Sequence, residues 1–143
     1  MALYLDSAYI AKLYLQEPDS NQVRKLVEGD PGLHSSAWCV VEMACIFHRH
    51  VREKRLTAEL ARRLTGFFKS DLRDGLLALS PLSEELLRKA EIVILDLPAP
   101  VFLRAGAAIH LVSAREAGFA EIWTNDRHLL AAAPHLGLRG RTV

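Results

Sequence analysis

The apolar positions along the chain change period several times, from the alternation of a strand to the three-to-four spacing of a helix. Short apolar runs predict strands at residues 2–5, 33–34, 76–79, 121–124 and 138–143. Helical spacing with capping signals predicts helices at residues 7–15, 20–28, 37–55, 58–72, 83–95, 101–117 and 126–133. Strands separated by helices are typical of a parallel sheet covered on both faces. We therefore expect an α/β protein, and its 143 residues fit a single domain spanning 1–143.

Composition fits a folded protein and excludes a general polycation. Half of the residues are hydrophobic, 24% are charged, and the formal net charge is +1. Contact with a nucleic acid would therefore need a local basic patch. No apolar run approaches the roughly 20 residues of a membrane span, and the start of the chain lacks the basic segment and cleavage site of a signal peptide. We expect a soluble, cytoplasmic protein that makes no contact with a membrane.

The two cysteines, Cys39 and Cys45, are six residues apart within one predicted helix. Six residues turn a helix by about 600°, so the two thiols should lie on different faces. We therefore expect neither a disulfide nor a zinc pair, and two buried thiols would suit a reducing compartment.

Two acidic residues follow predicted apolar strands. Asp6 comes directly after residues 2–5, and Asp126 comes just after residues 122–124. Because ligands bind outside the carboxyl ends of the strands in parallel sheets, both acids should lie near one site. Each acid could equally cap the helix that follows it, which is a common role for Asp. The two roles are compatible, since a helix N-terminus lies where such a site forms.

Glu42 stands inside the apolar segment 38–47 of a predicted helix. No cation lies among its helical neighbours at three and four positions, which are Trp38, Cys39, Cys45 and Ile46. A buried carboxylate needs compensation, so its partner must come from elsewhere in the fold: an Arg, a proton or a metal ion. Oxygen ligands without a His or Cys cluster favour a hard cation, Mg²⁺ or Mn²⁺, which commonly assists phosphoryl chemistry.

Four segments in order carry a family likeness. They are Leu5-Asp6-Ser7-Ala8 with Ile10 to Tyr14, the central Glu42, Arg104 to Leu111, and Thr124-Asn125-Asp126 with Arg127 to Leu130. This pattern resembles the PIN domain family, and more narrowly the VapC-type toxins of bacterial and archaeal toxin–antitoxin pairs. The resemblance covers essentially the whole chain.

The resemblance implies a three-layer α/β/α fold with a five-stranded parallel sheet. It also implies an endoribonuclease that depends on Mg²⁺ or Mn²⁺, forms homodimers and binds a small antitoxin in its active-site groove. By this correspondence, Asp6, Glu42 and Asp126 are metal ligands and catalytic acids, and an acid or the metal helps to deprotonate the attacking water. Ser7, Thr124 and Asn125 are supporting groups around the site.

One position departs from the family pattern. The fifth-helix motif normally carries an acid three residues before its His, and here Ala107 precedes His110. A methyl group cannot ligate a metal, so we expect this chain to bind metal poorly and to cut RNA slowly or not at all. The loss could be natural, another acid such as Asp96 or Glu116 could substitute, or an Asp could have been changed deliberately. The otherwise intact motif favours a recent or engineered change.

Other features leave alternatives open. The segment 48–73 is rich in Lys and Arg and could be an RNA-backbone patch or a solvated helical hairpin. His110 could orient a ligand, although a packed, hydrogen-bonded core residue is the preferred interpretation. Leu64, Phe67 and Phe68 could form a partner surface or belong to the core. A non-catalytic module that binds RNA or an antitoxin is the main alternative function, and a phosphoacceptor domain ranks below both.

Overall fold

The computed structural model describes residues 1–29 and 31–143. Its strands are β1 (Leu3–Tyr4), β2 (Leu33–Ser36), β3 (Leu77–Ser80), β4 (Glu121–Trp123) and β5 (Arg139–Arg141). The first three form a parallel sheet in the order β1-β2-β3, and β4 pairs with β5, also in parallel. The two sheets meet at one parallel bridge between Leu5 and Trp123. The Asp6 amide also donates to the Trp123 carbonyl oxygen at 3.1 Å, so β1 and β4 end side by side.

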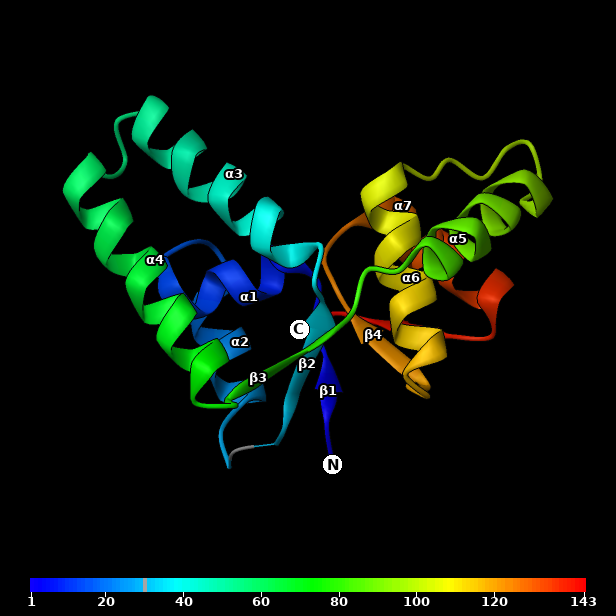
Figure 1. Ribbon diagram of the computed structural model, residues 1–143, viewed down its shortest axis with the longest axis horizontal. Coiled ribbons are helices and arrows are strands. Elements are labelled where there is room, and N and C mark those ends of the chain that lie inside the picture. The colour runs from blue at the N-terminus through cyan, green and yellow to red at the C-terminus, as the bar shows by residue number, and fades with distance from the viewer. Residues whose placement is uncertain (30) are drawn as a thin grey trace.

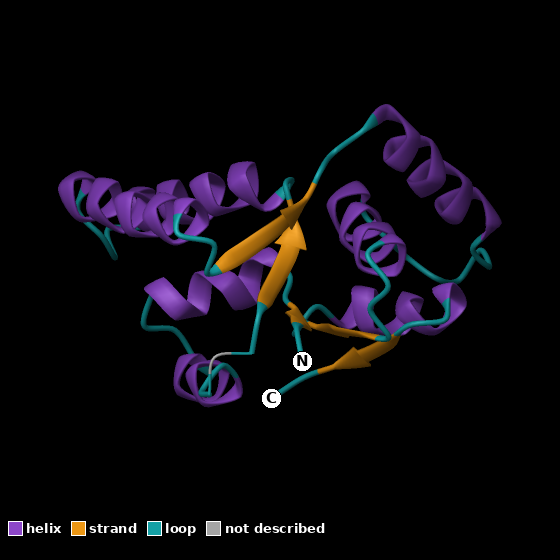
Figure 2. Ribbon diagram, turned by 60° about the horizontal axis from the view of Figure 1, so that its bottom comes forward, coloured by secondary structure: helices purple, strands orange, loops and turns teal. Residues whose placement is uncertain are grey.

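Helices cover both faces of this strand layer. One group comprises α1 (Ser7–Tyr14), α2 (Ser20–Leu26), α3 (Cys39–Arg52) and α4 (Ala58–Arg73). The other comprises α5 (Glu84–Asp96), α6 (Ala105–Glu116), α7 (Arg127–Ala132) and the 3₁₀ turn η1 (Ala133–Leu136). Figure 1 shows the strands between these two groups, with α3 and α4 projecting as a hairpin, and Figure 2 shows the same separation from a second direction.

The alternation of side chains along the first strand explains why the core has two halves. Tyr4 and Leu5 are both fully buried, but successive strand residues point to opposite faces. Tyr4 accordingly packs into the cluster formed with α5, α6 and α7, while Leu5 packs into the cluster formed with α1 to α4. One short strand thus holds the two helical layers on either side of it.

The three-layer α/β/α architecture is confirmed, and two details differ from the sequence expectations. The five strands form a three-stranded and a two-stranded sheet joined at a single bridge, because the chain leaves β1 at Asp6 to start α1. The predicted helix 101–117 starts only at Ala105, because Arg104 is extended, with φ −85° and ψ 160°.

The expectation of two buried thiols is wrong for one of them. Cys39 is buried and Cys45 is exposed, as the six-residue spacing on one helix requires. Burial raises the pKa of the Cys39 thiol to about 12. Among the described residues, no helix has both the length and the apolar character needed to cross a membrane.

Candidate functional site

A cleft of about 580 Å³ opens where β1 and β4 end. The carboxylates of Asp6, Glu42 and Asp126 all line it, together with Ser7 and Ala107. Asp6 and Asp126 arrive from neighbouring strand ends, and Glu42 arrives from the first turn of α3. The structure therefore gathers residues that lie up to 120 positions apart into one cavity.

Asp6 is the most enclosed of the three acids, with only 6% of the residue exposed. One carboxylate oxygen accepts the Tyr9 amide at 2.9 Å and caps α1, and the other accepts the Thr124 hydroxyl. Burial raises the pKa of Asp6, although nearby His110 and these hydrogen bonds act in the opposite direction. Asp6 is thus a helix cap and also part of the cleft wall.

Thr124 ties the two strand-end acids together. Its hydroxyl donates to Asp6 and accepts the Asp126 amide at 2.9 Å. Asp126 in turn caps α7, since one of its oxygens accepts the amides of His128 at 2.8 Å and Leu129 at 3.2 Å. Its second oxygen accepts no hydrogen bond among the described residues, and the residue is exposed to the cleft.

Glu42 finds its partner across the fold, and that partner is His110. Nε2 of His110 donates to Oε1 of Glu42 at 2.6 Å, and the Ser7 hydroxyl donates to the same oxygen at 2.8 Å. Partial burial acts to raise the pKa of Glu42, but the hydrogen bonds from His110 and Ser7 hold it below its usual value. The sequence analysis proposed an Arg, a proton or a metal for this position, so the histidine is a correction.

His110 is itself held in place from its other side. It is 2% exposed, and its Nδ1 lies 3.1 Å from the Tyr4 hydroxyl. A neutral imidazole protonated on Nε2 satisfies both contacts, because Tyr4 can then donate to Nδ1. The preferred interpretation of a packed, hydrogen-bonded histidine holds. The sequence did not predict that its partner is Glu42. The one indication that His110 lies near the site was that it shares a helix face with position 107.

The first turn of α6 approaches the first turn of α3 closely. A Cβ atom built on Gly106 would lie 3.0 Å from Nε1 of Trp38 and 3.3 Å from Oε2 of Glu42. Ala107, the next residue, presents its methyl group to the cleft. A carboxylate at position 107 would therefore enter the same cavity as Glu42.

Asn125 does not line this cleft. Its carbonyl oxygen accepts the Tyr9 hydroxyl at 2.8 Å and the Thr142 hydroxyl, and its amide donates to Asp19 at 3.1 Å. These bonds fasten the loop after β4 to α1 and to the end of the chain. The role of Asn125 as a supporting group thus stays a prediction. Its hydrogen bonds hold the loop after β4 and do not reach the cleft.

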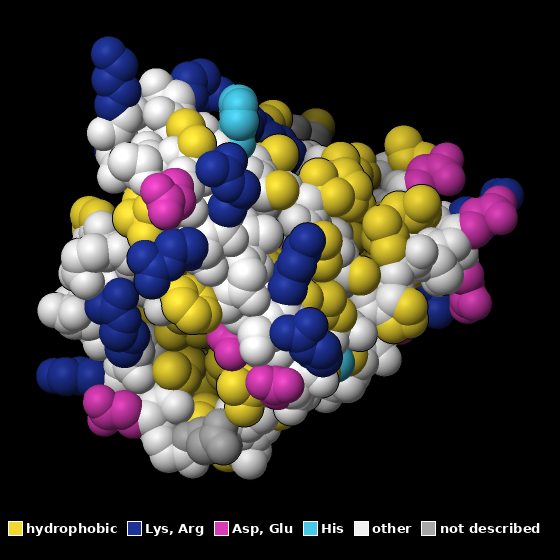
Figure 3. All heavy atoms as spheres, turned by 60° about the vertical axis from the view of Figure 1, so that its left-hand side comes forward, with side chains coloured by type: hydrophobic (Ala, Val, Ile, Leu, Met, Phe, Trp, Pro, Cys, Tyr) yellow, Lys and Arg dark blue, Asp and Glu magenta, His cyan; other side chains and the backbone are white. Residues whose placement is uncertain are grey.

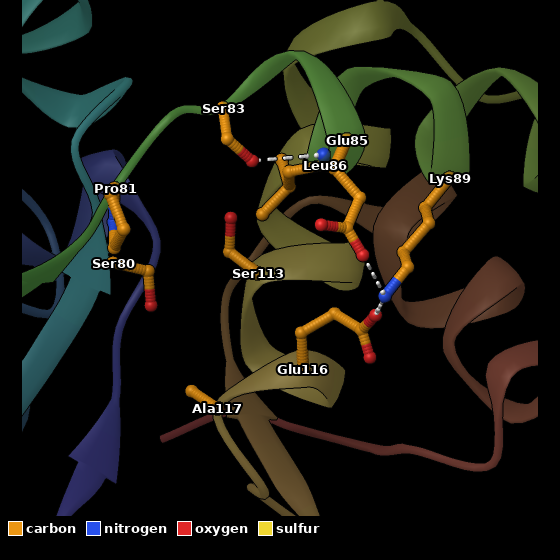
Figure 4. Close-up of a pocket in the computed structure, with 9 residues that line it drawn as sticks. All are labelled: Ser80, Pro81, Ser83, Glu85, Leu86, Lys89, Ser113, Glu116 and Ala117. Atoms are coloured by element: carbon orange, nitrogen blue, oxygen red, sulfur yellow. Dashed lines mark hydrogen bonds and ion pairs between the residues drawn. The ribbon is translucent and has the colours of Figure 1, made fainter.

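The two acids considered as substitutes for position 107 lie elsewhere. Asp96 and Glu116 line a separate cavity with Lys89 and His135, and neither reaches the cleft. Glu116 is held by an ion pair with Lys89, which Glu85 also approaches at 3.4 Å (Figure 4). Substitution by either acid is therefore wrong, because Glu116 is nine residues, or about 13 Å of helix, beyond Ala107.

The donor set is chemically suited to Mg²⁺ or Mn²⁺, but it is incomplete. Among residues 1–29 and 31–143, no three His, Cys, Asp or Glu side chains lie close enough together to hold a metal ion. Ala107, which also lines the cleft, offers no ligand. The residues present do not by themselves form a complete divalent-metal site.

The fold is a three-layer α/β/α sandwich, and its parallel strands carry carboxylates at one edge of the sheet. These features define a class of small α/β proteins with a site at the strand ends. Within this class, the chain belongs to the PIN domain family, whose model matches residues 3–134. No curated protein matches the chain.

Solved structures that share the fold include the following two. VapC20 of Mycobacterium tuberculosis, a sarcin–ricin loop cleaving toxin, superposes with a TM-score of 0.70 at 14% identity, covering 91% of this chain and 94% of VapC20. FitAB bound to the IR36 DNA fragment gives a TM-score of 0.66 at 15% identity, covering 99% of this chain and 94% of the matched chain. At these identities the likeness establishes the fold alone.

Proposed function

We propose that this chain is the toxin of a toxin–antitoxin pair, a PIN-domain endoribonuclease whose cleft is one carboxylate short. Membership in the PIN family and the fold shared with VapC20, a cleaving toxin, support the class. The observation that carries the proposal is the cleft itself, which Asp6, Glu42 and Asp126 line together with Ala107.

The missing acid sets the expected behaviour of the chain. Mg²⁺ or Mn²⁺ in such a site would supply charge neutralisation and activate water for hydrolysis of an RNA phosphodiester. Holding the ion would take the carboxylates of Asp6, Glu42 and Asp126 and a further oxygen donor, which position 107 does not supply. We therefore expect weak metal binding and slow or absent cleavage in the chain as it stands.

The decisive experiment restores the acid and compares it with a neutral residue of the same shape. Ala107→Asp should raise Mg²⁺- and Mn²⁺-dependent RNA cleavage by at least about 10- to 100-fold, since even an outer-sphere partner of a metal ligand is worth that much. Ala107→Asn adds nearly the same volume without the charge and should not. A chelator should abolish the gain, and calorimetry should show tighter metal binding only for Ala107→Asp.

The proposed impairment is contradicted if the unaltered chain cleaves RNA as fast as Ala107→Asp under the same conditions. The endoribonuclease assignment fails if Ala107→Asp binds metal tightly and still leaves every RNA tested intact.

A non-catalytic module that binds RNA or the antitoxin is the second candidate. The contact between Glu42 and His110 favours it, because that hydrogen bond compensates the Glu42 carboxylate without a metal. The two candidates separate in the restored variant: a binding module stays inactive as Ala107→Asp while retaining its ligand.

We further propose that the 143 residues act as one domain, that the chain pairs with itself, and that it binds a small antitoxin in the cytoplasm. Exposed apolar side chains support partner surfaces in two places. Ile92 and Leu95 on α5 are 58% and 74% exposed, and Val41 and Phe67 on the α3–α4 hairpin are 54% and 55% exposed. Phe68, by contrast, is buried and belongs to the core.

A further inference from the structure

Two arginines stand at the cleft that holds the three acids. Arg49 and Arg104 both line it, and with the three carboxylates they leave a formal charge of −1 when His110 is neutral. A carboxylate at position 107 would add one more negative charge, so the cleft of this chain repels a polyanion less than a complete acidic site would.

The arginines come from the two helical layers that enclose the cleft. Arg49 lies seven residues after Glu42, which is about two turns of α3 and therefore the same helix face. Arg104 immediately precedes α6, whose first turn carries Gly106 and Ala107 into the cleft. Figure 1 shows α3 and α6 in the two separate helical groups, and the cleft is lined by residues from both, including Arg49 and Arg104.

Both guanidinium groups are exposed and available. Among residues 1–29 and 31–143, neither Arg49 nor Arg104 makes a side-chain hydrogen bond or an ion pair, whereas Arg88 pairs with Glu84 at 2.6 Å. Arg104 lies over the Phe102 ring, with its central carbon 5.9 Å from the ring centroid. A free guanidinium offers a planar fork of donors that matches a phosphate in two hydrogen bonds.

We propose that Arg49 and Arg104 bind backbone phosphates of an RNA strand on the two sides of the carboxylate centre, and that this binding needs no metal. The inference rests on the proposed function for its substrate class and adds the residues that hold the substrate. Binding without a metal is expected because the two arginines line the same cleft as the three acids and reduce its formal charge to −1. In this proposal the arginines hold the RNA strand, and the acids serve its cleavage.

The surface around the cleft is compatible with a strand that continues beyond it. Arg52 and Lys69 are exposed on the same hairpin as Arg49. Figure 3 shows Lys and Arg side chains spread over the face on which this hairpin lies, with apolar side chains between them. These further cations give a diffuse attraction, whereas the pair in the cleft gives two defined contacts.

The test measures RNA binding by fluorescence anisotropy in the presence of a chelator, over a series of salt concentrations. The probe is a short labelled single-stranded RNA. Each phosphate contact to a single strand contributes about 0.7 to the slope of log affinity against log salt, so Arg49→Ala and Arg104→Ala should each lower the slope by about 0.7. Arg49→Lys and Arg104→Lys retain the charge and should retain the slope.

Two matched controls separate the cleft from general charge. Arg62→Ala removes a cation from the same hairpin, and Arg88→Ala removes one from α5 in the other helical layer. Both should leave the slope closer to that of the unaltered chain than either cleft variant does. All four sites are exposed, and thermal unfolding should confirm that the variants remain folded.

The proposal is overturned if the cleft variants bind RNA with an unchanged slope, which is also the result expected if the arginines serve an acidic protein segment. It is equally overturned if the control variants lose as much as the cleft variants. Its failure is distinguishable from failure of the proposed function, because RNA binding is measured without metal in the chain as it stands, and cleavage is measured in Ala107→Asp.

Discussion

Asp6 is a buried carboxylate that also caps a helix. Its carboxylate caps α1 and receives the Thr124 hydroxyl, yet burial still raises its pKa. A residue needed only as a cap could be an Asn, which caps as well and carries no charge. The raised pKa of Asp6 therefore predicts that a neutral Asn at this position would make the folded chain more stable.

The first prediction concerns the pH dependence of stability in Asp6→Asn, measured with a chelator present. Because the folded-state pKa of Asp6 is raised, the folded protein holds an extra proton between the unfolded value near 3.8 and the folded value. Stability should therefore fall as pH rises through that window in the unaltered chain. Asp6→Asn should lack this fall and should gain on the order of 1 kcal/mol of unfolding free energy at neutral pH.

Glu42 has the opposite effect on the pH dependence of stability, and it is present in both the unaltered chain and Asp6→Asn. Its lowered pKa gives stability that is present above its usual value near 4.5 and is lost as pH falls through the folded value. Denaturant unfolding of the two proteins from pH 4 to 8 isolates the contribution of Asp6 in the difference between them. Parallel curves for the two proteins would contradict the prediction.

Each acid at a strand end belongs at once to a helix and to the cleft. The β4–α7 connection shows this most simply, since Asp126 caps α7 with one oxygen and leaves the other free of hydrogen bonds to the described residues. A capping side chain and a ligand side chain can therefore be separated by substitution. Asn and Ala at this position make the separation, because only Asn can still accept the two amides.

The second prediction is that Asp126→Asn keeps the stability of the parent within a few tenths of a kcal/mol, while Asp126→Ala loses about 1 kcal/mol. In the Ala107→Asp background both variants should lose RNA cleavage, since both remove the carboxylate. Thermal or denaturant unfolding checks the first half, and a cleavage assay checks the second. Cleavage that survives in Asp126→Asn would remove Asp126 from the catalytic set.

Among the described helices, α5 has the most exposed large apolar side chains. Leu87, Ile92, Ile94 and Leu95 are each at least 38% exposed, and the opposite side of α5 packs on α6. Apolar groups concentrated in this way commonly mark a protein–protein surface. We therefore assign the proposed self-association to α5 and leave the hairpin face for other partners.

The third prediction is that the chain sediments as a dimer and that Leu95→Lys shifts it to a monomer at the same concentration. Leu95 is 74% exposed, so the substitution should change the stability of the monomer by no more than about 0.5 kcal/mol. Phe67→Lys on α4 is the matched control and should leave the dimer intact. Dimers that persist in Leu95→Lys and dissociate in Phe67→Lys would place the interface on the hairpin.

Local features of the sequence determined much of the fold. The alternating and helical periods predicted the strands and helices, because burial on one or two faces imposes those periods on the chain. The placement of Asp6 and Asp126 after strands predicted that they share an edge, because parallel strands end together. The start of α6 was missed by four residues, since an extended segment of apolar residues has no periodic signal of its own.

The tertiary structure decided how the acids are partnered and what surrounds them. His110 compensates Glu42 from 68 residues away, and Arg49 and Arg104 reach the same cleft from different helical layers. Local sequence spacing predicts none of these contacts, because each depends on how α3 and α6 pack across the strands. The sequence alone determined that an acidic strand-end site exists and that position 107 carries no acid. Only the packing of the two helical layers decided that a histidine holds Glu42 and that Arg49 and Arg104 line the cleft.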